Sequence, residues 1–114
     1  MEDCIFCKIA RGDIPSKKVY EDETVLAFHD IDGKAPVHVL VIPKKHIQNI
    51  ISFEEEDRAL QNHLLDVIKK VAEEMGVSET GFRVVANTGA DGGQTVNHLH
   101  FHILGGRSLQ WPPG

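Results

Sequence analysis

Cysteine is scarce in this chain, and long apolar runs are missing. The 114 residues include only two cysteines, Cys4 and Cys7. In a reducing compartment, a pair so close together favours a metal or redox pair over a structural disulfide. No apolar run approaches the ~20 residues that span a bilayer, and the first four residues lack the basic and then apolar order of a secretory signal. We therefore expect no membrane partner and a cytoplasmic location.

An excess of basic residues is also missing. Lysine and arginine number 12 against 17 aspartates and glutamates, which leaves a net charge of −5 with the histidines neutral. This balance argues against a nucleic-acid partner and favours a small ligand, because bulk electrostatics would not attract an anionic polymer. The length fits one domain, residues 1–114, which can bury roughly two-thirds of the surface that its unfolded chain exposes.

The pattern along the chain is mixed α and β. Asp3 is placed to cap a short helix that runs to about Ala10, because Gly12 and Pro15 then break helical continuation. Alternating and β-branched stretches, separated by turn residues, predict strands over 18–21, 24–30, 37–42 and 82–87. The stretch over 37–42 is the richest in β-branched residues, so it is expected at the centre of the sheet.

One long helix is expected in the second half of the chain. Ser52 and Glu55 have the spacing of a capping box, which predicts that the helix begins there. Gly76 is placed to close it. His63 has no partner nearby in sequence and is interpreted as a boundary residue without a function. The apolar residues that recur at helical spacing are Leu60, Leu64, Leu65, Val67, Ile68, Val71, Ala72 and Met75.

Three histidines, His98, His100 and His102, stand at every second position near the C-terminus. This alternation is typical of a β-strand and predicts that the three imidazoles share one surface. One metal ion for all three is awkward, because the outer Cα atoms of an extended strand would be about 13 Å apart while a zinc–nitrogen bond is only ~2 Å. The middle residue, His100, is better placed as a nucleophile, with its neighbours stabilising charge.

A glycine-rich loop over residues 87–95 precedes these histidines. Its backbone N–H groups can turn toward one point and hold a phosphate, although such loops are also ordinary turns. Asn87 adds an amide, and the hydroxyl of Thr95 can donate to a phosphate oxygen or a leaving group. His38 interrupts an apolar strand, which leaves two interpretations open: a site residue, or a buried histidine satisfied by backbone groups.

These motifs resemble the histidine triad (HIT) family and its Hint branch. Residues 98–104 (HLHFHIL) resemble the triad signature, in which apolar residues separate three histidines. Residues 27–31 (AFHDI), 41–46 (VIPKKH) and 91–94 (DGGQ), and the tail over 105–114, resemble Hint proteins in the same order. The chain departs from the Hint pattern at two positions. Thr95 stands where serine is usual, and Asn97 stands where an aromatic residue is common before the triad.

The resemblance implies a fold and an activity. The fold would be α+β, with an antiparallel sheet of about five strands, one long helix and a short N-terminal helix, and the sheet would continue across a homodimer. The tail over 105–114 would lie near the active site. The activity would be a phosphoramidase that cleaves purine nucleoside 5′-phosphoramidates, derivatives of AMP or GMP, through a nucleotidyl-histidine intermediate, without an organic cofactor.

The resemblance also implies roles for individual residues. His100 would be the nucleophile. The phosphate would be surrounded by His38, Gly93, Thr95 and His102, with Asn87 near the phosphate and ribose. Asp30 would accept the ribose hydroxyls. The base would be walled by Phe6, Ile9, Phe28, Ile31 and Leu40. The proton for the leaving group would come from Thr95, a histidine or the substrate itself.

The cysteine pair resembles that of zinc-bearing relatives. On the residues alone, the C-x-x-C of Cys4 and Cys7 leaves a metal site and ordinary buried thiols both open. The resemblance adds His46 and His98 as the other two ligands. Two thiolates and two imidazoles form a closed tetrahedral set, which is the arrangement of structural zinc.

Other activities remain open at this point. A dinucleoside polyphosphate hydrolase or a nucleotidyl transferase would use the same histidine intermediate. A nucleotide-binding interaction protein with incidental activity would bind nucleotide tightly and turn it over negligibly.

Overall fold

The chain forms one antiparallel sheet with a helix on each face. The computed structural model describes residues 3–114. Met1 and Glu2 lie outside the described residues; they belong to the first four residues, which are predicted to lack a secretory signal. In chain order, the elements are α1 (Ile5–Arg11), β1 (Lys18–Glu21), β2 (Val25–His29), β3 (Val37–Pro43), the 3₁₀ turns η1 (Ile50–Ser52) and η2 (Glu55–Asp57), α2 (Arg58–Glu74), β4 (Phe82–Val85) and β5 (Phe101–Gly105).

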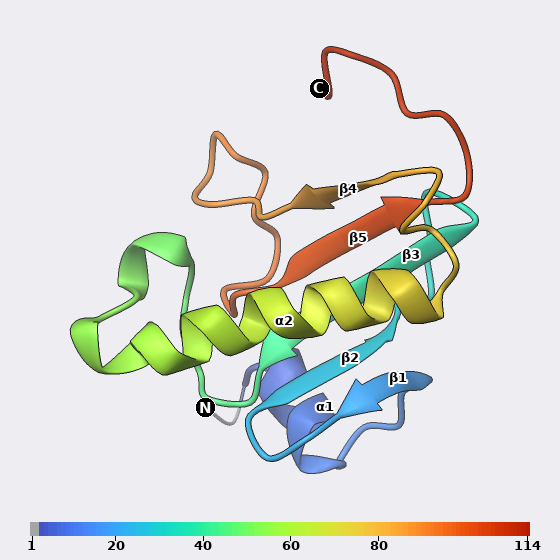
Figure 1. Ribbon diagram of the computed structural model, residues 1–114. Coiled ribbons are helices and arrows are strands. Elements are labelled where there is room, and N and C mark those ends of the chain that lie inside the picture. Colours follow the sequence, from blue (N-terminus) through green and yellow to red (C-terminus); the bar gives the residue numbers. More distant parts are fainter. Residues whose placement is uncertain (1–2) are drawn as a thin grey trace.

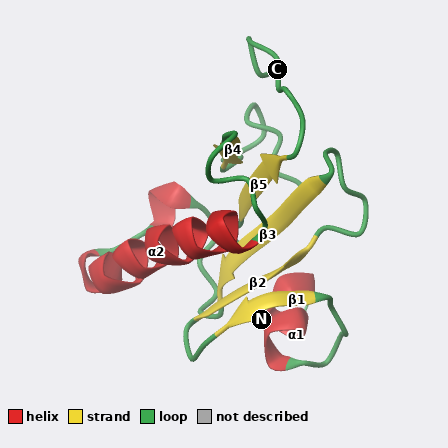
Figure 2. Ribbon diagram, turned by 45° about the vertical axis from the view of Figure 1, so that its right-hand side comes forward, coloured by secondary structure: helices red, strands yellow, loops and turns green. Residues whose placement is uncertain are grey.

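The five strands lie in the order β1-β2-β3-β5-β4, and every neighbouring pair is antiparallel. The predicted α+β class is confirmed, and so is the central place of the β-branched strand β3. Asp22 closes the β1–β2 hairpin, because its Oδ1 accepts from the backbone N–H groups of Thr24 and Val25. The long helix α2 crosses one face of the sheet, and α1 lies near β1 and β2 (Figures 1 and 2).

Both faces of β2 and β3 are buried, which explains why the sequences of these strands are apolar runs. Alternate residues point to opposite faces. The core between one face of the sheet and the apolar stripe of α2 includes Val25, Ala27, Val39, Val41, Leu64, Val67, Ile68, Val71, Leu99 and Ile103. The core between the other face and α1 includes Phe6, Ile9, Leu26, Phe28, Leu40 and Ile42. Residues 99, 101 and 103 therefore face the core as predicted, with Phe101 only partly buried.

The predicted start of the long helix is wrong. Helix α2 begins at Arg58, after two 3₁₀ turns, and not at Ser52. The hydroxyl of Ser52 instead donates to Asn49 Oδ1, which also accepts from the N–H of Ile51 and so caps η1. Closer to the helix, Asp57 Oδ2 accepts from the N–H of Glu54 at 2.9 Å. Gly76 follows the helix with φ 75°, in agreement with its predicted closing role.

Smaller differences concern the ends of other elements. Cys4, not Asp3, caps α1, because its Sγ accepts from the N–H of Cys7. Leu65 is 63% exposed and does not belong to the buried stripe of α2. Strand β4 ends at Val85, before the predicted end at residue 87. The glycine-rich loop begins at residue 87.

The C-terminal tail leaves the sheet beside β4 and β5 (Figure 1). Arg83 of β4 donates to the carbonyl of Gln110 at 2.9 Å, and Trp111 remains 82% exposed. Among the described residues, no helix is both long and apolar enough to cross a bilayer.

Candidate functional site

A cavity of about 300 Å³ lies between α1, the end of β2, the middle of β3, and β5 with the segment that leads into it. All five predicted base-wall residues line it, namely Phe6, Ile9, Phe28, Ile31 and Leu40. The polar lining includes four further predicted residues, Asp30, Thr95, His100 and His102. A larger hollow of about 490 Å³ at the start of α2 is lined by Phe53, Glu54, Glu55, Arg58, Gln61 and Asn62 and contains no imidazole or thiol.

Sequence reasoning missed part of the lining. The cavity is also lined by Ile5, Ile14, Pro15, Ser16, His29 and Val96. Ile14 carried a usable signal, because it is a lone apolar residue between the end of α1 and β1. Gly12, with φ 84°, reverses the chain at the end of α1 and so directs this segment back toward the cavity.

The ring of His100 lines this cavity and is oriented by one backbone contact. Its Nδ1 lies 2.7 Å from the backbone carbonyl of His98. A carbonyl only accepts, so Nδ1 carries the proton and Nε2 of the neutral ring keeps its lone pair. Phe6 packs edge-on against the ring, with centroids 5.0 Å apart, and His100 is only 6% exposed. This is the arrangement that a histidine nucleophile requires.

A chain of hydrogen bonds also fixes the proton positions of His38 and His102. The backbone N–H of Lys34 donates to His38 Nδ1 at 3.0 Å. In the neutral ring, Nε2 of His38 therefore carries the proton and donates to His102 Nδ1 at 2.9 Å. His102 Nε2 then carries a proton of its own. His102 can thus donate to an anionic oxygen without being positively charged.

Burial keeps both rings neutral near neutral pH. Burial lowers the pKa of His38, although the nearby Asp30 carboxylate opposes the change. Burial also lowers the pKa of His102 to about 4, and the neighbouring rings of His100 and His38 add to the effect. Desolvation disfavours the charged form of an imidazole, so both directions follow from the positions of the rings, His38 buried and His102 partly buried.

Asp30 lies at the rim of the same cavity. Its Oδ1 accepts from the N–H of Asp32 at 2.8 Å, while Oδ2 lies 3.5 Å from His38 Nε2. Ligand atoms of Asp30, His38 and His102 lie within 4.8 Å of one another, which is close enough for a metal ion. Nε2 of His38 carries a proton, however, so it has no lone pair for a metal. We therefore assign these three residues to a hydrogen-bonded site.

The glycine-rich loop contributes less of the cavity lining than its sequence suggests. Thr95 lines the cavity, whereas Asn87 and Gly93 are not among its lining residues. The N–H of Gly93 donates to the carbonyl of Ala90 at 3.0 Å, within the turn itself. The phosphate roles of Asn87 and Gly93 stay predictions.

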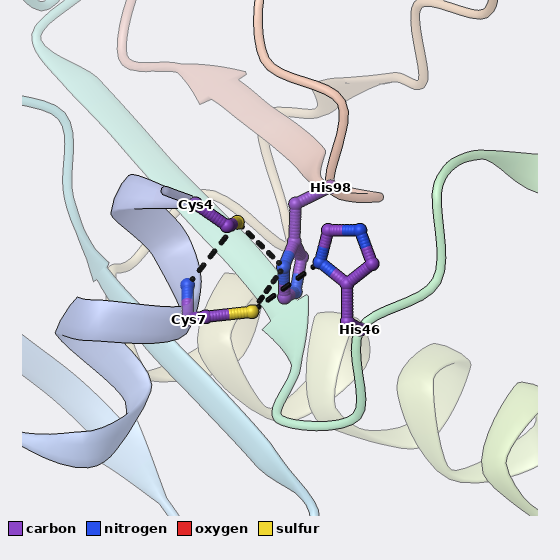
Figure 3. Close-up of side chains that lie close together, drawn as sticks. All are labelled: Cys4, Cys7, His46 and His98. Carbon is purple, nitrogen blue, oxygen red and sulfur yellow. Dashed lines mark hydrogen bonds between the residues drawn. The ribbon is translucent and has the colours of Figure 1, made fainter. Parts of the chain in front are cut away.

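A second group of chemically active side chains lies next to the cavity. Cys4, Cys7, His46 and His98, here called the cysteine–histidine cluster, bring one ligand atom each to within 4.8 Å of one another (Figure 3). The Nδ1 of His98 lies 3.3 Å from Cys4 Sγ and 3.5 Å from Cys7 Sγ. His46 Nδ1 lies 3.3 Å from Cys7 Sγ. The four residues come from α1, the segment after β3 and the segment before β5.

The cluster fits a tetrahedral cation such as zinc. Zinc–sulfur and zinc–nitrogen bonds at tetrahedral angles place sulfur and nitrogen about 3.6 Å apart, close to the observed separations. Nε2 of His98 lies 2.8 Å from the carbonyl of Pro43, so it carries the proton and Nδ1 keeps its lone pair for a ligand bond. Burial, followed by the neighbouring Cys4, raises the pKa of the Cys7 thiol. A bound cation would offset the cost of ionising it.

The three histidines do not share one strand, which corrects the prediction. Strand β5 begins at Phe101, so only His102 lies within it, and bends occupy residues 96–98. His98 is fully buried and its ring joins the cysteine–histidine cluster, while His100 and His102 line the cavity. The bends turn the segment before β5 and thereby divide the triad between two sites.

His63 has a partner that is remote in sequence. Its Nε2 contacts Asp22 Oδ2, from the β1–β2 turn. Burial opposes ionisation of Asp22, but hydrogen bonds from Tyr20, from the Thr24 and Val25 backbone and from His63 outweigh it and lower the pKa of this carboxyl. His63 thus ties α2 to the hairpin, outside the cavity.

The whole chain is similar to proteins of one family. A model of the HIT domain matches residues 11–109. An uncharacterized HIT-like protein of Synechococcus elongatus is 56% identical over 113 residues, which cover 99% of this chain and 98% of that protein.

Solved structures show the same likeness in three dimensions. A HIT family hydrolase from Legionella pneumophila is 50% identical and superposes with a TM-score of 0.95, covering 98% of this chain and all of that one. A histidine triad protein from Clostridium difficile is 54% identical, with a TM-score of 0.92 and 96% of each chain covered. The chain therefore belongs to the HIT domain family.

Proposed function

We propose that this protein is a nucleotide hydrolase of the phosphoramidase type, which cleaves purine nucleoside 5′-phosphoramidates through a nucleotidyl-histidine intermediate. The observation that carries the proposal is the 2.7 Å contact between His100 Nδ1 and the His98 carbonyl, which places the proton of the neutral ring on Nδ1 and leaves the lone pair on Nε2. His100 lines the cavity beside His102, and their ring centroids are 5.0 Å apart. The similarity to a HIT family hydrolase from Legionella pneumophila supports a hydrolytic activity.

The chemistry proceeds in two displacements. His100 Nε2 attacks the phosphorus and forms a nitrogen–phosphorus bond, while the bond from phosphorus to the leaving nitrogen breaks and the amine departs with a proton from Thr95, a histidine or the substrate itself. Water then attacks the phosphorus and releases a proton to the solvent, the bond to Nε2 breaks, and the nucleoside monophosphate leaves with His100 neutral again. Splitting one displacement into two lowers each barrier.

Neutral donors stabilise the phosphorus centre in this proposal. His102 Nε2–H, fixed through the hydrogen bond from His38, donates to a phosphate oxygen as negative charge develops. The Thr95 hydroxyl, which also lines the cavity, is a second donor. A donor without formal charge avoids a tight ion pair with the product monophosphate.

The rest of the cavity suits a nucleoside. Phe6 and Phe28 lie edge to face, with centroids 5.8 Å apart, and form part of an apolar wall for a planar base. Asp30 is the acceptor for the ribose hydroxyls, because it lines the cavity and the N–H of Asp32 holds one of its carboxylate oxygens in place.

Two further features belong to the proposal. The cysteine–histidine cluster holds a structural zinc ion, which would tie α1 to the segment before β5. The protein works as a homodimer in which β4 pairs with its copy, since β4 is an edge strand and its Phe82 and Val84 are 38% and 41% exposed. Cys4 and Cys7 form no disulfide with each other, which suits a reducing cytoplasm.

Metal analysis tests the zinc site. Freshly purified protein is expected to contain about one zinc per chain, and Cys4→Ser is expected to lose it, since only three ligands remain. A zinc content near zero in both proteins would contradict the assignment.

Hydrolysis of an adenosine 5′-phosphoramidate tests the activity. His100→Ala is expected to lose turnover by at least about 10³-fold, while His63→Ala, which removes a histidine outside the cavity, retains it. Acid-quenched wild type should carry a nucleotidyl adduct on the peptide that contains His100. Equal turnover in wild type and His100→Ala would exclude this nucleophile. Tight nucleotide binding without turnover would favour an interaction protein, and preference for dinucleoside polyphosphates would favour that hydrolase class.

A further inference from the structure

The cysteine–histidine cluster and the nucleophile are joined through one residue. His98 gives its ring to the cluster and its backbone carbonyl to His100. We propose that the cluster is a positioning element for the reaction, because a zinc-like cation held there fixes the His98 carbonyl and through it the orientation and tautomer of His100. This inference rests on the proposed function, in which His100 Nε2 attacks the phosphorus.

The first step of the argument is how tightly His98 is held. Its ring is fully buried, and Nδ1 faces both cysteine sulfurs while Nε2 bonds to the carbonyl of Pro43 at 2.8 Å. The following N–H, of Leu99, donates to the carbonyl of Ile47 at 2.6 Å, one residue after His46. The His98 carbonyl therefore lies between two fixed groups, the His98 ring and the Leu99 N–H. The ligands Cys4, Cys7 and His46 help to hold the ring.

The second step runs through α1. Cys4 Sγ caps this helix by accepting from the N–H of Cys7, so the residues that would hold the cation also form its first turn. Between them, Phe6 packs edge-on against both His98 and His100, with centroids 5.9 Å and 5.0 Å apart. Drawing the two sulfurs to a cation thus also presses the Phe6 ring against the nucleophile.

The third step is what an unfilled cluster would change. Without a cation, the sulfurs and the two imidazoles are joined only by weak hydrogen bonds between sulfur and nitrogen, at 3.3 to 3.5 Å. The His98 carbonyl would then be held only through the Leu99 N–H and the bond from His98 Nε2 to Pro43, and its orientation toward His100 would be less firmly fixed. A neutral His100 without this acceptor also adopts the tautomer with the proton on Nε2, which has no lone pair for attack.

The competing view is that the cluster only stabilises the fold. Under that view, a metal-free protein held well below its unfolding temperature would react as fast as the zinc-loaded one. If the cluster positions His100, the chemical step is slower in the metal-free protein. The affinity for nucleotide is unchanged, because the apolar wall and Asp30 remain. The loss of one net hydrogen bond of this kind corresponds to about a tenfold change in rate.

The first measurement reads the tautomer directly and does not depend on activity. Protein with ¹⁵N-labelled histidine is compared zinc-loaded, chelator-stripped and zinc-restored by long-range ¹H–¹⁵N correlation, with His100→Ala assigning the signals. We expect only the Nδ1–H form of His100 with zinc, an additional Nε2–H form without it, and recovery on restoration. Circular dichroism checks that the stripped protein is folded.

The second measurement separates binding from chemistry. His46→Gln removes one ligand and keeps three, while the matched control His63→Gln removes a histidine outside the cluster. For His46→Gln and for stripped wild type, we expect kcat for the phosphoramidate to fall about tenfold, with the Kd for AMP changed less than about twofold. His63→Gln should match wild type in both. If stripping unfolds the protein, His46→Gln supplies both measurements.

The outcomes are separable. A folded, metal-free protein whose His100 tautomer and kcat both equal those of the zinc-loaded protein would overturn the positioning role and leave the proposed function intact. A wild type that binds AMP but hydrolyses no phosphoramidate would overturn the proposed function, while the tautomer measurement would still decide whether the cluster controls His100.

Discussion

Acid should destabilise this protein through His102, which lies partly buried as a neutral ring. Its pKa falls from an ordinary value of 6.5 to about 4, because burial and the neighbouring rings of His100 and His38 oppose the charged form. Between these two values, the unfolded chain binds a proton at this position and the folded protein does not. The free energy of unfolding therefore declines as the pH falls from 6.5 toward 4, and is fully retained above about pH 7.

The expected size follows from the same two values. Because His102 takes up a proton more readily in the unfolded chain than in the folded protein, lowering the pH from 7.5 to 5 removes about 2 kcal/mol of the free energy of unfolding. His38 acts in the same direction, because burial lowers its pKa as well. The contribution of His102 alone is isolated by His102→Gln, which keeps a polar side chain but cannot titrate.

Urea unfolding at several pH values tests this reasoning. The wild type should lose about 2 kcal/mol more than His102→Gln between pH 7.5 and pH 5. Leu26→Ala serves as a control, because it destabilises the protein without removing a titrating group and should keep the wild-type pH dependence. Protonation of the cysteine–histidine cluster affects all three proteins and cancels in the comparison. Equal losses in wild type and His102→Gln would refute the argument.

Three substitutions test the packing and the helix start by urea unfolding. Leu26→Ala should cost about 2–5 kcal/mol, since the side chain is fully buried and truncation leaves a cavity; a cost under about 1 kcal/mol would contradict that packing. Gly105→Ala should cost about 1–3 kcal/mol, because a Cβ there would lie 2.8 Å from Val77 Cγ1; failure of Val77→Ala to relieve the cost would exclude this clash. Asp57→Ala should cost about 1–2 kcal/mol, because Asp57 accepts from both the Glu54 N–H and Lys45 Nζ; an unchanged midpoint would exclude that anchoring.

Local patterns predicted much of the fold. The β-branched stretch over 37–42 is the central strand, because it packs α1 on one face and α2 on the other. The helical stripe of α2 and its glycine stop were also predictable, since both depend on residues close in sequence. Strand order was not predicted, because pairing of β3 with β5 joins segments about sixty residues apart.

Competition between neighbouring side chains explains the errors. Ser52 has the spacing of a helix cap, but the side chain of Asn49 captures its hydroxyl and forms a 3₁₀ turn first. Alternation predicted one strand through His98, but burial of that ring against the cysteines bends the segment before β5. In both cases the sequence has the local pattern, but a contact that the pattern does not encode determines the local structure.

The site was predicted as a set of residues rather than as a network. The motifs indicated His38, His100 and His102, and the resemblance gave them roles. The bonds that fix their protons come from backbone groups, the N–H of Lys34 and the carbonyl of His98. Any residue has such groups, so no sequence motif reports them. Likewise, the contact between His63 and Asp22 crosses from α2 to the hairpin and leaves no local signal.

The spacing of the cluster along the chain has a consequence for synthesis. Cys4 and His98 are 94 positions apart, with His46 between them. Because translation proceeds from the N-terminus, His98 is the last ligand to leave the ribosome, after both helices and β1 to β4. A nascent or truncated chain that stops before it offers at most three ligands and binds a cation weakly. Retention of the ion would therefore distinguish chains that have reached the nucleophile from those that have not.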